Sequence, residues 1–169
     1  MYFHEAIQQR INEMSARYTQ MKQLAQLAYD YGFRAAEIID INNTIQTSGS
    51  DKIITGKKKG RTQVITDPAA VQNLDDFINL WNDGYLKCSY SKYYNAINLF
   101  FGDFHKTGGK RDIATHLFRY AKAQAVYIQT KNLLSVCEAI REVDSKNAEM
   151  YVFSTFVNEN FVPFTIINR

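Results

Sequence analysis

The sequence predicts a mostly α-helical domain with a small β-hairpin or sheet, which is an α+β fold. Apolar residues recur at helical spacing along most of the chain, whereas a single pair of short β-prone runs flanks a turn-like segment. The chain has 169 residues, of which 46% are hydrophobic, and no repeat or linker divides it. We therefore expect a single domain that covers residues 1–169.

The N-terminal part of the chain is predicted to be helical. Apolar residues recur every three or four positions from residue 4 to about residue 31, which predicts one long helix or two short ones that end at Gly32. A further helical run covers residues 35–41. The asparagine, serine and glycine residues within 42–50 then predict a loop.

The expected strands are residues 52–54 and 63–65, which flank a cationic turn. Asp67 and Pro68 are typical of a helix start, and Ser91 is expected to cap a later helix. After a break at residues 107–109, helical patterns return. The helices predicted in this part of the chain cover residues 67–81, 91–101, 113–131 and 133–143. The apolar C-terminal tail, residues 152–169, is expected to dock on a protein surface.

Composition excludes several classes of protein. The net charge of +3 permits a polyanionic partner but does not indicate one. Cys88 and Cys137 lie far apart, so they indicate neither a disulfide framework nor a zinc site, and we expect no metal ion or other cofactor. No apolar run is long enough to span a membrane, so we expect a cytoplasmic protein without a membrane partner.

Five residues form the candidate site, although each has an ordinary structural explanation when taken alone. Arg34 follows a glycine bend, and Lys57 lies at the tip of the predicted hairpin. His116 and Arg119 are three positions apart, which places them on one face of a helix. Tyr151 lies near the end of the last helical stretch. A surface ion pair, a solvated turn, a core histidine and a core tyrosine are the alternative interpretations.

In order and spacing, these residues resemble the active-site boxes of the tyrosine recombinase (phage integrase) superfamily. Residues 31–38, Tyr-Gly-Phe-Arg-Ala-Ala-Glu-Ile, are similar to the first arginine box, and residues 54–61, Ile-Thr-Gly-Lys-Lys-Lys-Gly-Arg, are similar to the lysine hairpin. His-Leu-Phe-Arg at 116–119 matches the H-x-x-R box. Ala-Glu-Met-Tyr at 148–151 resembles the nucleophile segment, with the tyrosine 35 residues after the histidine. The resemblance extends from about residue 20 to Tyr151.

The resemblance implies the fold of a recombinase catalytic domain and a reaction. The enzyme would be a site-specific recombinase or integrase that breaks and rejoins DNA through a covalent 3′-phosphotyrosyl intermediate, with Tyr151 as nucleophile. Arg34 and Arg119 would clamp the phosphate, because guanidinium groups match its geometry. Lys57 would protonate the departing 5′ oxygen, and His116 would assist proton transfer or hold the phosphate. This chemistry requires no metal or nucleotide cofactor.

The implied partner is double-stranded DNA. The resemblance implies that four protomers assemble on two duplexes, either as a homo-oligomer or with a partner recombinase. It also implies a protein that is nucleoid-associated or encoded by a virus or mobile element. Cationic residues outside the boxes would contact phosphates, or else belong to an ordinary solvated surface. These are Lys58, Lys59, Arg61, Lys106, Lys110, Arg111 and Lys122.

The sequence also departs from the family pattern. Glu142 stands where a second histidine or a tryptophan is usual, and a carboxylate there would repel phosphate. Lys146 could substitute, the alignment could be offset, or activity could be impaired. Tyr120 follows the H-x-x-R box where another histidine is common, and Lys58 and Lys59 compete with Lys57.

Architecture is the other departure, because we expect the N-terminal clamp (core-binding) domain of the family to be absent. The C-terminal tail would then pack either on a neighbouring protomer or on its own domain. Two other functions are also open: a catalytically decayed or regulatory DNA-binding protein of the same fold, and a small helical interaction module.

Overall fold

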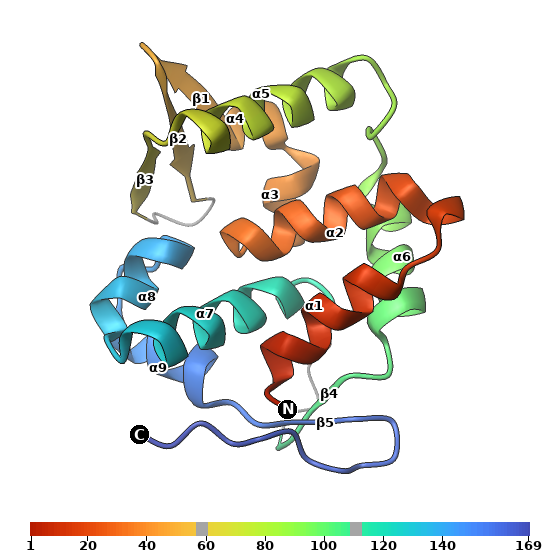
Figure 1. Ribbon diagram of the computed structural model, residues 1–169, viewed down its shortest axis with the longest axis vertical. Helices are drawn as coiled ribbons and strands as arrows, with labels where there is room; N and C mark the ends of the chain where they lie inside the picture. Colours follow the sequence, from red (N-terminus) through yellow and green to blue (C-terminus); the bar gives the residue numbers. More distant parts are fainter. Residues whose placement is uncertain (57–60, 109–112) are drawn as a thin grey trace.

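The computed structural model describes residues 1–56, 61–108 and 113–169 (Figure 1). The predicted α+β class is confirmed, since helices dominate and two small antiparallel sheets accompany them. The helices are α1 (Phe3–Glu13), η1 (Ala16–Tyr18), α2 (Thr19–Tyr31), α3 (Ala35–Ile39), α4 (Ile41–Thr44), α5 (Pro68–Asn82), α6 (Tyr90–Phe101), α7 (Leu117–Thr130), α8 (Leu133–Ile140) and α9 (Ser145–Phe153). The strands are β1 (Ile45–Ser48), β2 (Asp51–Thr55), β3 (Thr62–Ile65), β4 (His105–Lys106) and β5 (Phe156–Val157).

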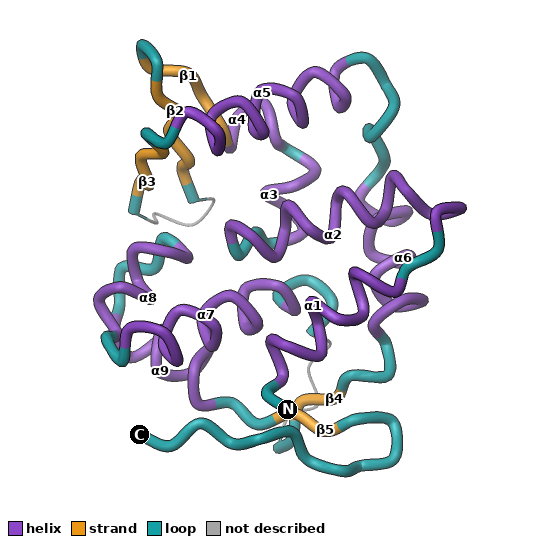
Figure 2. The backbone as a smooth tube through the Cα atoms, viewed as in Figure 1, coloured by secondary structure: helices purple, strands orange, loops and turns teal. Residues whose placement is uncertain are grey.

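Helix α7 lies at the centre of the molecule and packs against α1, α2, α8 and α9. The three-stranded sheet and α5 lie at one end of the molecule, and the C-terminal tail crosses the other end (Figures 1 and 2). The N-terminal half of α7 is buried on almost every face, and the small side chains of Ala121 and Ala123 allow its neighbours to approach closely. No helix in the described ranges is long and apolar enough to cross a membrane.

The N-terminal pattern forms two helices, which was one of the two predicted outcomes. Helix α1 ends at Glu13, the hydroxyl of Ser15 caps η1, and α2 then runs to Tyr31. Gly32 ends α2 in the left-handed conformation, with φ of 61°. A Cβ atom at this position would lie 2.9 Å from Cγ2 of Ile140, so both backbone freedom and close packing require glycine here.

The predicted loop at residues 42–50 is wrong, because this segment contains the end of α4 and all of β1. Strand β1 pairs with β2 in antiparallel register, with Ile45 opposite Ile54, and both side chains are buried. Gly49, at φ of 62°, provides the left-handed turn between the two strands. The burial of Ile45 and its pairing with Ile54 outweigh the turn propensity of its polar neighbours. The predicted pairing of the 52–54 and 63–65 strands is confirmed as β2–β3.

Three predicted helix ends shift. The hydroxyl of Ser89, rather than that of Ser91, accepts the capping hydrogen bond, from the N–H of Lys92 at 3.1 Å. Helix α7 begins at Leu117 instead of residue 113. Helix α8 ends at Ile140 instead of residue 143, because Arg141 takes a left-handed conformation, with φ of 58°.

The C-terminal tail packs on its own chain in this structure. Strand β5 pairs with β4, and the ring of Phe156 stacks on that of Phe3 with centroids 3.8 Å apart. Further along, the N–H of Thr165 donates to the carbonyl of Met1 at 2.9 Å. The tail therefore covers the N-terminal end of α1, where it completes the core.

An ion pair joins α1 to the segment after α6. The guanidinium of Arg10 donates to both carboxylate oxygens of Asp103, at 2.7 and 2.6 Å, and to the carbonyl of Phe100 at 2.7 Å. The hydrogen bonds from Arg10 hold the pKa of Asp103 below its ordinary value of 3.8. The carboxylate form of Asp103 therefore stabilises the contact between α1 and the segment that follows α6.

We expect Asp103→Asn to lower the free energy of unfolding by about 1 kcal/mol at pH 7, since the pair is bidentate but half-exposed. A depressed pKa in the folded state means that the stabilisation is complete well above pH 3.8 and is lost as the pH falls through the lower, folded-state value. The difference between variant and wild type should thus vanish in strong acid. Urea unfolding between pH 7 and pH 2 measures it, with Asp76→Asn as the control. A constant difference across this range would contradict the assignment.

Candidate active site

The structure brings three sequence-predicted residues from separate elements to one pocket of about 550 Å³. Arg34 is the N-cap residue of α3, His116 is the N-cap residue of α7, and Tyr151 lies in α9. Seven further residues complete the lining, among them Ile113, Thr115, Asn147 and Met150. The charged and aromatic side chains of the lining are Arg34, Lys106, His116, Tyr120, Glu142 and Tyr151.

Arg34 is held in place by the first turn of its own helix. Its backbone N–H donates to Oε1 of Glu37 at 2.8 Å, and its guanidinium lies 3.9 Å from the same oxygen. The carboxylate of Glu37 is fully buried. On the pocket side, Nη2 of Arg34 lies 3.8 Å from Oε2 of Glu142. Nε of Arg34 is buried and makes no hydrogen bond with the described residues. The side chain is therefore oriented by Glu37 and retains an unused donor.

Arg119 lies behind the pocket wall, where its side chain is fully buried. Nη1 donates to the carbonyl of Ile140, and Nη2 lies 3.1 Å from Oε2 of Glu142. Its guanidinium carbon is 5.1 Å from the ring centre of Tyr151, which is a cation–π contact. Arg119 is thus in contact with the aromatic ring that carries the candidate nucleophile.

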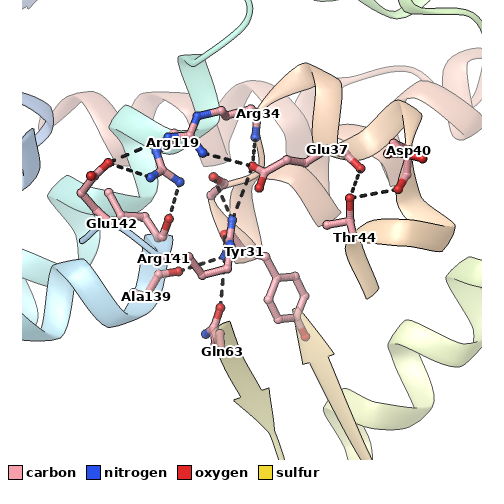
Figure 3. A network of polar contacts seen from close by, with 12 residues as sticks. Tyr31, Arg34, Glu37, Asp40, Thr44, Gln63, Arg119, Ala139, Arg141 and Glu142 are labelled. Atoms are coloured by element: carbon pink, nitrogen blue, oxygen red, sulfur yellow. Dashed lines mark hydrogen bonds and ion pairs between the residues drawn. The ribbon is translucent and has the colours of Figure 1, made fainter. Parts of the chain in front are cut away.

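Glu142 contacts both arginines (Figure 3), and its side chain lines the pocket. It is the residue at which the sequence departs from the family pattern. Lys146 is exposed on α9 and is not part of the pocket lining. Burial by itself raises the pKa of Glu142, but hydrogen bonds from Asn147 and Arg119 outweigh it and lower the pKa below its ordinary value. The pocket therefore contains a carboxylate that is ionised at neutral pH.

Arg141 is a buried charged residue that the sequence did not reveal. Its guanidinium donates to the carbonyl of Tyr31 at 2.7 Å and to Oε1 of Gln63 at 3.1 Å, and it lies 3.7 Å from Glu37 (Figure 3). Burial lowers its pKa to about 10, although Glu37 opposes the shift, so it stays protonated at neutral pH. Its left-handed backbone costs about 1 kcal/mol or more, which these contacts offset. Glycine is the usual residue at a left-handed helix end, and its absence after α8 is the one feature of the sequence that relates to this unusual end.

The five charged residues Arg34, Glu37, Arg119, Arg141 and Glu142 form one arginine–glutamate cluster. Three guanidinium groups face two carboxylates, so the cluster carries one uncompensated positive charge. Such a site favours a bound anion with a single negative charge, and a DNA phosphodiester has this charge. In the described ranges, no group of His, Cys, Asp and Glu residues is arranged to hold a metal ion.

Tyr151 and His116 face the same pocket but lie on different elements. The Tyr151 side chain is mostly buried, and its ring centre lies 6.4 Å from that of His116 and 4.8 Å from that of Tyr120. The prediction that His116 and Arg119 share a helix face is wrong. His116 has non-helical φ and ψ of −127° and 4°, and α7 begins after it. The N-cap position directs its side chain to the pocket instead.

Of the other predicted DNA contacts that the structure describes, Lys106 lines this pocket, whereas Arg61 and Lys122 do not. Arg61 borders a separate hollow next to Gln63 and Glu138. Lys122 is half-buried on α7 close to Asp30, and burial lowers its pKa although Asp30 opposes the shift. The remaining predicted cations lie outside the described residues. These are Lys57, the predicted general acid, and Lys58, Lys59, Lys110 and Arg111.

Comparison with known proteins identifies the fold. No protein-family model matches the sequence, and no curated protein matches it. Among solved structures, the chain is similar to XerA recombinase, with a TM-score of 0.62 and 15% identity over 90% of this chain and 60% of that one. It is also similar to the XerH site-specific recombinase in a post-cleavage complex with a palindromic difH substrate. The TM-score is 0.54 and the identity is 18%, over 88% of this chain and 47% of the XerH chain.

The chain thus spans about half to three fifths of the length of these recombinases. Identities of 15% and 18% show the fold alone. The chain has a tyrosine recombinase fold, as the resemblance of its four boxes predicted.

Arg141→Met preserves much of the side-chain volume but removes one partner of the buried Glu37 carboxylate. We expect the free energy of unfolding, measured by urea denaturation, to fall by about 3 kcal/mol. Arg17→Met is the control, because the Arg17 side chain is exposed and its guanidinium lies over the neighbouring Tyr18 ring; it should cost under about 0.5 kcal/mol. An Arg141→Met protein as stable as wild type would show that the cluster does not depend on this residue.

Proposed function

We propose that this chain, with its tyrosine recombinase fold, is a site-specific DNA recombinase that acts through a covalent 3′-phosphotyrosyl intermediate. The observation that supports this most strongly is that Tyr151 shares one pocket with Arg34 and His116, although the three come from different elements. Arg119 contacts the tyrosine ring from behind. The XerH site-specific recombinase in complex with a palindromic difH substrate supports the proposal of DNA as the substrate class.

In this mechanism, the phenolic oxygen of Tyr151 attacks the scissile phosphorus and displaces the 5′ oxygen. The phenolic proton passes to His116 or to solvent, and Lys57 donates a proton to the leaving oxygen. Arg34 and Arg119 stabilise the negative charge that develops on the non-bridging oxygens. The free 5′ hydroxyl of another strand then attacks the phosphotyrosine, which releases Tyr151 and rejoins the DNA. The energy of the broken bond is conserved in the tyrosyl ester.

Phosphate must share the arginines with Glu142. The carboxylate of Glu142 lies 3.1 Å from Arg119 and 3.8 Å from Arg34. It therefore occupies the places in which phosphate oxygens would accept hydrogen bonds from these guanidinium groups. A phosphodiester that enters the pocket would therefore displace Glu142 from Arg34 or weaken that contact. This competition favours a second candidate function, a regulatory DNA-binding protein of the same fold with little cleavage activity.

DNA outside the pocket would be held by phosphate contacts, and binding should weaken steeply with salt. We propose that residues 1–169 form one catalytic domain, which assembles on DNA as a tetramer or together with a partner recombinase. The C-terminal tail would then either stay on its own domain or move to a neighbour. The proposed phosphate contacts are Lys58, Lys59, Arg61, Lys110, Arg111 and Lys122.

The first test uses nicked suicide DNA substrates made from the sequences that flank the gene. Wild type should form a protein–DNA adduct that survives denaturation, and Tyr151→Phe should abolish it while noncovalent DNA binding persists, because only the nucleophilic oxygen is removed. Tyr127→Phe, in α7 and outside the pocket lining, is the control and should form the adduct normally.

Two outcomes would count against the proposal. An adduct that persists in Tyr151→Phe would place the nucleophile elsewhere. DNA binding without any adduct in wild type would favour the regulatory function.

A second test removes the competing carboxylate. We expect Glu142→Gln to raise the rate of adduct formation about tenfold, because one negative charge next to the phosphate is lost. Glu13→Gln changes an exposed carboxylate of α1 outside the pocket and should have no effect. A lower rate in Glu142→Gln would mean that Glu142 orients the arginines instead of competing with phosphate.

A further inference from the structure

We propose that Lys106 is a further phosphate-contacting residue of this site. The proposal rests on the proposed function and deepens it. The sequence presented Lys106 as one surface cation among several, yet its side chain lines the same pocket as Arg34 and Tyr151. Arg61 and Lys122, the described cations from the same group, do not. Lys106 therefore differs from them in position.

The ammonium of Lys106 is held on one aromatic side chain of the pocket. Nζ donates to the hydroxyl of Tyr120 at 2.9 Å and lies 4.9 Å from the centre of that ring. The ring of Tyr120 in turn lies 4.8 Å from the ring of Tyr151. A free lysine loses about 2 kcal/mol of rotamer entropy when it is ordered. Because Tyr120 already orders this lysine, less of that cost remains when a phosphate binds.

The backbone of Lys106 is fixed relative to the helix that carries Tyr151. Lys106 pairs with Phe156 in the β4–β5 ladder, and the N–H of Thr107 donates to the carbonyl of Thr155 at 2.9 Å. Helix α9 ends at Phe153, so this ladder begins directly after the helix of Tyr151. The packing of the C-terminal tail therefore connects the backbone of the lysine to the helix of the tyrosine, and both side chains line the same pocket.

Charge explains why a lysine is needed here. Among the described lining residues, Arg34, Lys106 and Glu142 carry formal charges at neutral pH, and Glu142 lies 3.8 Å from Arg34. Those two charges compensate each other at the wall. Lys106 makes no ion pair with a carboxylate of the described residues. It supplies the uncompensated positive charge of the pocket surface, while the charge of Arg119 lies buried behind it.

A lysine ammonium has three donors, so Nζ keeps its bond to Tyr120 while it donates to a non-bridging phosphate oxygen. The contact needs no change of backbone, because the side chain already borders the cavity. Lys106 thereby offsets the repulsion that Glu142 exerts on phosphate. This is how a pocket with a carboxylate in place of an imidazole stays attractive to a phosphodiester.

The test measures affinity for inorganic phosphate, from the rise of the melting temperature with phosphate concentration at constant ionic strength. Lys106→Met should bind phosphate about tenfold more weakly than wild type, the loss expected for one charge-assisted hydrogen bond. Lys106→Arg retains the charge and should stay within about threefold of wild type. Lys131→Met is the matched control, since Lys131 also lies over a tyrosine ring, that of Tyr127 at 5.5 Å, but outside the pocket lining.

Lys106→Gln is a second neutral variant that keeps a donor for Tyr120, and it replaces Lys106→Met if that protein does not fold. A neutral variant that binds phosphate as tightly as wild type overturns the proposal. So does an equal loss in Lys106→Arg, because the role would then be structural. A wild type that shows no phosphate-dependent stabilisation also overturns it.

Adduct formation on the suicide substrate separates this proposal from the proposed function. Loss of phosphate affinity in Lys106→Met together with a wild type that forms no adduct supports the Lys106 contact and overturns strand cleavage. If wild type forms the adduct, and Lys106→Met changes neither the rate of adduct formation nor the affinity of the protein for phosphate, cleavage is supported and the Lys106 contact is overturned. If both proposals hold, the adduct should form about a hundredfold more slowly in Lys106→Met.

Discussion

The candidate site depends on the arginine–glutamate cluster, in which two carboxylates hold three buried or nearly buried guanidinium groups together. Charges of this kind are costly to bury unless they are paired and hydrogen-bonded. The cluster meets this condition by joining the end of α2, the start of α3, strand β3 and the end of α8 through Arg141 and Glu37. The elements around the pocket are therefore positioned by the same contacts that stabilise the charges.

The cluster is not electrically balanced, and this imbalance connects stability with function. Fully paired charges would be indifferent to an anion, whereas the surplus positive charge attracts one. We propose that Glu142 reduces this attraction at the pocket wall and that Lys106 increases it from the β4–β5 side. In the proposed function, the affinity of the pocket for phosphate depends on one carboxylate and one ammonium outside the four boxes of the resemblance.

Local sequence signals predicted the elements whose ends are determined locally. Asp67 and Pro68 mark the start of α5, because the carboxylate caps the helix and proline needs no hydrogen-bond donor there. Gly32 marks the end of α2 for a similar reason. Strands β4 and β5 were missed, since they form only by pairing with each other across a long stretch of the chain. Strand β1 was missed because its polar residues predicted a loop, although it forms a local hairpin with β2. The helix end at Arg141 was missed because its stabilising contacts are distant in sequence.

The sequence by itself determined the fold class and the order of the residue boxes that indicated a tyrosine recombinase fold. Periodicity, caps and turn residues are local, and box spacing is a property of the chain. Only the tertiary structure decided that Arg34, His116 and Tyr151 line one pocket, that Glu142 bridges Arg34 and Arg119, and that Lys106 borders the same cavity. Ion pairs and pocket walls form between segments many residues apart, so their geometry follows from how the helices pack around α7.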